Sequence, residues 1–97
     1  MKEYIKCLNE TSIPNEKGAN FAPLVIWRKG EYYRILKESD KYIWPMNEIL
    51  FSISKNKIID NLFENMIALE KPSGARVPLG FIRLTEDEVK AEKEKNN

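Results

Sequence analysis

Aromatic and basic residues alternate along residues 24–44, and this stretch has the residue types needed for binding chemistry. Its sequence, LVIWRKGEYYRILKESDKYIW, holds both tryptophans and three of the four tyrosines of the chain. Aromatic rings offer stacking area and basic groups form charge-assisted hydrogen bonds, so such a surface suits a protein partner or a single-stranded nucleic acid. The candidate binding residues are Trp27, Arg28, Lys29, Tyr32, Arg34, Tyr42 and Trp44.

The same alternation also has a purely structural interpretation. Successive side chains of a strand point to opposite faces, so about half of these aromatics would enter a core while the bases stay outside. The orientation of Trp27, Tyr32 and Trp44 therefore decides between a recognition face and the wall of a barrel. The residues assigned to packing are Leu24, Ile26, Tyr33 and Ile35, and those expected outside are Arg28, Lys29, Arg34 and Lys37.

The chain lacks the groups that most enzymes use. It contains no histidine, which removes the usual general base and the commonest metal ligand. Its one cysteine, Cys7, cannot build a structural zinc site or an internal disulfide, and its β-prone surroundings predict a buried thiol. The glycines are isolated, so none belongs to a phosphate-binding loop. We therefore expect no enzymatic activity, no metal and no cofactor.

Composition indicates a small globular domain. The chain has 97 residues, 42% of them hydrophobic, and a net charge of +1. This near balance of charge argues against an acidic protein that mimics nucleic acid and against a strongly basic protein that coats DNA. There is no apolar run resembling a signal peptide or a membrane span, which predicts a cytoplasmic protein without membrane contact. The richness in Lys, Asn and Ile suggests an AT-rich genome. These features favour a phage-like or mobile-element-type accessory protein that binds and modulates a host protein, for example as an inhibitor.

Five β-prone segments must position the candidate residues. Residues 4–8 alternate, with Ile5 and Cys7 on one face. Lys29-Gly30 is expected to be a two-residue turn between strands over 24–28 and 32–37, because Gly30 takes positive φ without steric cost. The remaining expected strands are 41–44 and 76–84, the latter an edge strand with Val77, Leu79 and Phe81 facing one way. Residues 9–20 are expected to form a long loop that could recognise a ligand.

The middle of the chain is ambiguous and its end is charged. Residues 46–53 allow either helical spacing or strand alternation, and we expect a strand over 48–53 because its apolar stripe points away from the next one. Residues 55–70 predict an amphipathic helix. Residues 85–97 form a charged tail, in which the capping-box pattern of Thr85 and Glu88 predicts a short, frayed helix with little to bury.

The succession IKCL, VIWRKGEYYRIL and KYIWP resembles the small SH3-like barrels of many bacterial and phage accessory proteins. The resemblance covers about the first half of the chain and rests on pattern, so it transfers no binding residues. We expect residues 1–84 to form one α+β domain. Its architecture would be a mostly antiparallel curved sheet or partly open SH3-like barrel of five or six strands, packed by the helix over 55–70. The expected function is a non-catalytic protein-binding module; the alternative is a weak single-stranded nucleic-acid-binding domain that uses the basic, aromatic hairpin face.

Overall fold

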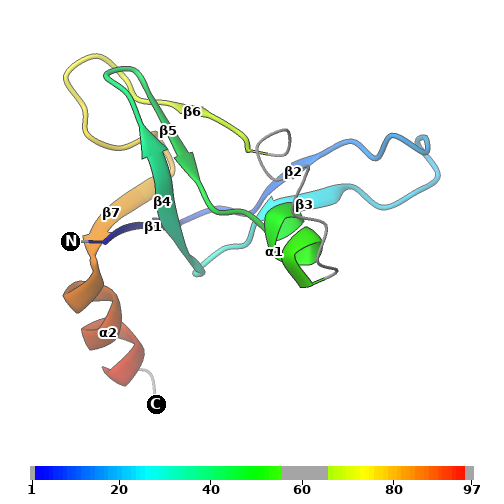
Figure 1. Ribbon diagram of the computed structural model, residues 1–97. Helices are drawn as coiled ribbons and strands as arrows, with labels where there is room; N and C mark the ends of the chain where they lie inside the picture. The colour runs from blue at the N-terminus through cyan, green and yellow to red at the C-terminus, as the bar shows by residue number, and fades with distance from the viewer. Residues whose placement is uncertain (1, 56–65, 96–97) are drawn as a thin grey trace.

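Five antiparallel strands form a curled half-barrel, and a second, two-stranded sheet projects from it (Figure 1). The computed structural model describes residues 2–55 and 66–95. The larger sheet has the strand order β6-β5-β4-β1-β7, and the smaller one pairs β2 with β3. The predicted α+β class with a curved, mostly antiparallel sheet is confirmed. The strands are β1 (Glu3–Cys7), β2 (Thr11–Ile13), β3 (Leu24–Trp27), β4 (Tyr32–Glu38), β5 (Tyr42–Pro45), β6 (Leu69–Glu70) and β7 (Phe81–Thr85), and the helices are α1 (Glu48–Lys55) and α2 (Glu86–Lys95).

Strand β1 lies between β4 and β7 and sets the two faces of the half-barrel. Ile5 pairs with Tyr33 on β4 and with Arg83 on β7. Ile5 and Cys7 are completely buried on the inner face. They share a face as the alternation predicted, because successive residues of a strand point to opposite sides, and Cys7 has the predicted buried thiol. The buried core cluster consists of Ile5, Cys7, Ile26, Trp27, Tyr33, Ile43 and Phe81.

The prediction of a hairpin at Lys29-Gly30 is wrong, although a turn does form there. The Glu31 N–H donates to the Arg28 carbonyl at 3.2 Å, and Gly30 has a φ of 82°. However, β3 pairs with β2, and β4 pairs with β1 and β5. Residues 11–13, expected to be part of a loop, provide the partner strand for β3, so the turn carries the chain from the smaller sheet into the larger one.

The strand expected over residues 48–53 is also wrong, because this segment belongs to helix α1. The Asn47 side-chain oxygen accepts a hydrogen bond from the Leu50 N–H at 2.9 Å, which is the geometry of an N-cap. Leu50 is completely buried, whereas Phe51 is 40% exposed. Strand alternation would have placed Phe51 on the same face as Ile49, which packs against the core. The helical spacing has therefore prevailed over the strand alternation.

The amphipathic helix predicted for residues 55–70 lies largely outside the described residues, which omit 56–65. Residues 66–68 are not helical, and Leu69–Glu70 form β6. In β6, Leu69 pairs with the buried Ile43 of β5 and packs against the core. Residues 66–70 are therefore not helical, and Leu69 is packed as part of an edge strand beside Ile43.

The last strand is shorter than expected but has the expected edge position. It begins at Phe81, and Leu79, which was expected to share the inward face of Phe81, is 85% exposed in the preceding turn. Helix α2 follows directly and contacts β1 and β7. Its capping box is formed, with the Glu88 N–H donating to the Thr85 hydroxyl at 3.2 Å. Val89 is only 5% exposed and anchors α2. Neither described helix has the length and apolarity needed to span a bilayer.

Candidate functional site

An ion-pair network fixes one end of the larger sheet. Arg83 of β7 donates to Glu3 of β1 and, at 2.7 and 2.9 Å, to both carboxylate oxygens of Glu38 on β4. Lys71 reaches Glu38 at 2.8 Å, and Arg83 also donates to the Arg76 carbonyl at 2.9 Å. Hydrogen bonds from Arg83 and then Lys71 lower the pKa of Glu38 to about 2. These carboxylates are therefore committed to holding strands together.

A bulge in β4 sends Glu38 into this network. Ile35 pairs with Pro45 and Glu38 pairs with Ile43, so the register shifts between them by one extra residue. Without the bulge, residues three apart would lie on opposite faces of the sheet. With the bulge, Ile35 and Glu38 share the inner face, and Lys37 lies opposite Trp44 on the outer face.

The outer face of β4 and β5 carries a group of aromatic and basic side chains. The Lys37 ammonium lies 4.8 Å from the centre of the Trp44 ring, and the Tyr42 and Trp44 ring centres are 6.1 Å apart. Arg34 is exposed beside them on β4. We call these four residues, Arg34, Lys37, Tyr42 and Trp44, the aromatic face. It combines ring surface with positive charge.

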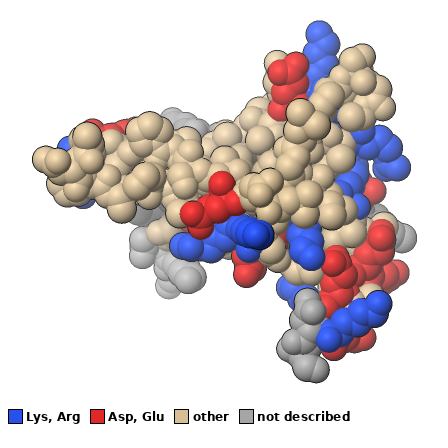
Figure 2. Space-filling model, turned by 180° about the vertical axis from the view of Figure 1, so that it is seen from behind, with Lys and Arg blue, Asp and Glu red and all other residues tan. Residues whose placement is uncertain are grey.

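A projecting arm, residues 11–25, forms a second candidate surface (Figure 1). Three large apolar side chains are exposed on it: Ile13 at 41%, Phe21 at 52% and Leu24 at 40%. A hollow of about 550 Å³, lined by Ile13 and Phe21 among others, lies at its end. The arm carries only two charges, Glu16 and Lys17, and Figure 2 shows it almost entirely without charged atoms.

The assignment of Trp27 to a binding surface is wrong, because Trp27 is 2% exposed. Its indole N–H donates to the Met46 carbonyl at 2.9 Å, and its ring packs perpendicular to Phe81 with centres 5.7 Å apart. Together with Ile26, Trp27 attaches the arm to the core. Leu24, which was assigned to packing, belongs instead to the exposed part of the arm.

The other predicted residues are divided between three places. Arg28 and Lys29 are exposed at the turn, where Arg28 pairs with Glu48 at 3.1 Å. Tyr32 is half-buried beneath the ammonium groups of Lys6 and Lys93, each 5.5 Å from its ring centre. The remaining predicted residues, which share the aromatic face, are Arg34, Tyr42 and Trp44.

Two buried groups with the potential for chemistry have structural roles. The Tyr33 hydroxyl accepts from the Arg28 N–H at 2.6 Å and donates to Glu48 at 3.0 Å. Burial, reinforced by Glu48, raises the pKa of Tyr33 well above its ordinary value, so the phenol stays protonated. Burial likewise raises the pKa of the Cys7 thiol, which donates to the Asn9 carbonyl at 2.9 Å. Within the described residues, no cluster of His, Cys, Asp or Glu could hold a metal ion.

Sequence reasoning missed the apolar residues of the arm as binding candidates. It identified residues 9–20 as a possible recognition loop but gave no role to Ile13, and Phe21 lay outside that range. The available signal was a run of apolar residues, FAPLV at 21–25, next to a segment with few charges. Such a run is either core or contact surface, and only the position of the arm distinguishes these two roles.

The fold and these surfaces define an α+β half-barrel with a projecting β-arm and an aromatic outer face. No protein-family model, curated protein or solved structure matches the chain. Its function must therefore be inferred from the geometry of these two surfaces.

Proposed function

We propose that the protein is a small non-catalytic protein-binding module and that the arm is its contact surface. The observation that supports this proposal is the gathering of Ile13, Phe21 and Leu24 on an element that stands away from the core. Exposed apolar groups that are contiguous and border a hollow are typical of protein contact sites. Acting by occupying a surface of its partner suits an accessory protein of this size.

The charge of the arm favours an apolar protein surface as its partner. Glu16 and Lys17 are adjacent and opposite in sign, so the arm is neutral overall and attracts neither phosphates nor a charged protein face. Affinity must then come from burial. Completing the burial of a large apolar side chain that is about half exposed contributes roughly 1 kcal/mol, and three such residues contribute about 3 kcal/mol. Loss of Phe21 alone should therefore weaken binding by about fivefold.

The experiment is site-specific photocrosslinking. A photoreactive phenylalanine analogue at position 21 is expected to capture a partner in near-stoichiometric yield from a lysate of the source organism. The same analogue at Lys90, on the exposed side of α2, should not capture it. With the captured protein in purified form, Phe21→Ser should weaken binding about fivefold. Its free energy of unfolding should stay within about 0.5 kcal/mol of the wild type, because Phe21 lies outside the core.

Leu79→Ser is the matched control, because Leu79 is the most exposed of the large apolar residues that the structure describes, at 85%, and it precedes β7 rather than lying on the arm. This variant should bind normally. Equal loss of binding in Phe21→Ser and Leu79→Ser would indicate non-specific hydrophobic association and contradict the proposal. Capture of a second copy of the chain, or equal capture from positions 21 and 90, would also contradict it.

A further inference from the structure

The aromatic face borders a hollow with an excess of positive charge. A cavity of about 510 Å³ is lined by Lys2, Arg34 and Lys37, and also by Glu3 and Glu38. These two carboxylates are already paired with Arg83, as the network above describes. No described ion pair involves any of the three cations, which are all exposed.

The unpaired charges around the hollow are therefore mostly positive, although the net charge of the whole chain is only +1. Against the three cations stands one further carboxylate, Glu86, whose backbone N–H donates to the Lys2 carbonyl. Arg83, with its side chain 13% exposed, pairs with both Glu3 and Glu38, and Lys71 also pairs with Glu38, so these two cations together neutralise the two carboxylates. The network that fixes the sheet thus leaves a positive rim on the outer side, which complements an anionic ligand.

Ring surface lies next to this rim. Lys37 lines the hollow and also covers Trp44 at 4.8 Å, so it links the cationic rim to the aromatic pair. Tyr42 is 40% exposed, and its ring centre is 6.1 Å from that of Trp44. A ligand that follows this surface would meet cations and then rings. A single strand of nucleic acid, with its phosphates and bases, presents those two chemistries.

We propose that the aromatic face and the adjoining hollow bind single-stranded nucleic acid, separately from protein binding by the arm. In this arrangement Trp44 and Tyr42 stack on bases, while Arg34, Lys37 and Lys2 contact phosphates. Base stacking on aromatic side chains is tolerant of sequence, and cations along a strand face track the backbone. A simple anion such as inorganic polyphosphate would use the cations alone and gain nothing from the rings.

The test is fluorescence anisotropy with a labelled oligothymidine of about a dozen nucleotides, which lies within the usual site size for such surfaces. Binding is expected at low salt. The plot of log affinity against log salt should have a slope of about −2, because three cations contribute about 0.7 each for a single strand. Trp44→Ala should weaken binding roughly ten- to a hundredfold, and Trp44→Phe should restore most of it. Arg34→Ala should make the salt slope shallower by about 0.7.

Lys29→Ala is the matched control, because it removes the same charge from an exposed turn outside the aromatic face. It should leave both the affinity and the salt slope unchanged. Each variant is first shown to be folded by the signal of the buried Trp27. No binding at low salt, equal effects of Arg34→Ala and Lys29→Ala, or inorganic polyphosphate binding that is as sensitive to Trp44→Ala as the oligonucleotide would overturn the proposal. None of these outcomes bears on the arm, because its apolar residues are not involved.

Discussion

Replacing Glu38 by Gln tests whether the Arg83 network stabilises the fold. Hydrogen bonds from Arg83 and Lys71 lower the pKa of Glu38 from its ordinary value of 4.5 to about 2. This lowering of the pKa of Glu38 corresponds to roughly 3 kcal/mol of differential stabilisation. The Glu38 side chain is 34% exposed, so solvent screens the pair and we expect a contribution of about 1–2 kcal/mol. Glu38→Gln should therefore lower the free energy of unfolding at pH 7 by about 1–2 kcal/mol.

The pH dependence has a definite direction. The pKa of Glu38 is lower in the folded protein than in the unfolded chain, so its contribution is fully present above about pH 4.5. It is lost as the pH falls toward about 2, where the carboxyl group becomes protonated in both states. A neutral carboxylic acid and an amide are similar in shape and charge. The difference in stability between the wild type and Glu38→Gln should therefore nearly vanish at the acid end.

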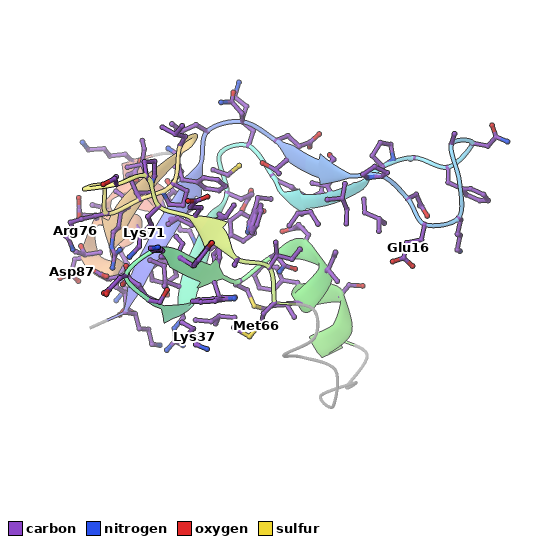
Figure 3. The ribbon with its side chains drawn as sticks, turned by 90° about the horizontal axis from the view of Figure 1, so that it is seen from above. Glu16, Lys37, Met66, Lys71, Arg76 and Asp87 are labelled. Carbon is purple, nitrogen blue, oxygen red and sulfur yellow. The ribbon has the colours of Figure 1, made fainter. Side chains whose placement is uncertain are left out.

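The assay is urea unfolding followed by tryptophan fluorescence at several pH values between 7 and about 2, with the variant and wild type compared at each value. Glu16→Gln is the control. It makes the same change of charge on the exposed arm, at the opposite end of the molecule from Lys71 and Arg76 (Figure 3), and Glu16 is in none of the described ion pairs. A stability difference for Glu38→Gln that does not change with pH, or that Glu16→Gln reproduces, would refute the reasoning.

Two further substitutions test how the turn and the C-terminal helix are held. Tyr33→Phe should cost about 1–3 kcal/mol in urea unfolding, because it leaves the Arg28 N–H and Glu48 without the hydroxyl that joins them. An unchanged midpoint would mean that water replaces this hydroxyl. Val89→Ser should detach α2 from the sheet, because Val89 is the buried residue of this helix. The measurement is amide hydrogen exchange, which should become faster over residues 86–95 while β1 stays protected. Lys90→Ser, on the exposed side, should leave that exchange unchanged, and equal exchange in both variants would show that Val89 does not anchor α2.

The faces of individual strands could be predicted from the sequence because alternation is a local property. Ile26, Tyr33 and Ile35 were assigned to packing and lie in or against the core, and Arg34 and Lys37 were assigned outward and are exposed. The covalent geometry of an extended chain fixes these relations, whichever strand lies alongside. The curved antiparallel sheet followed from having several such segments in one small chain.

Strand partners could not be predicted in the same way, because pairing depends on contacts between distant residues. The Gly30 turn suggested a hairpin between its flanking strands, yet the competing pairing of β3 with Thr11–Ile13 and of β4 with β1 prevailed. That exchange moves Trp27 from an open hairpin surface into the core. The helix α1 was missed for a different reason: the strand was preferred because the apolar stripe of residues 46–53 points away from the next one, and the local signal of the Asn47 cap was not used.

Two features that local propensity does not specify therefore determine which tryptophan can meet a ligand. Pairing of β3 with β2 turns Trp27 toward Phe81 and the Met46 carbonyl, where its indole N–H is satisfied. The bulge in β4 places Lys37 opposite Trp44 on the outer face, where the ring keeps a cation beside it. The aromatic side chains of residues 24–44 thus fall into two groups, a core half that is buried and a surface half on the outer face. The proposed nucleic-acid site depends on the surface half, while the core half fixes the base of the arm on which protein binding depends.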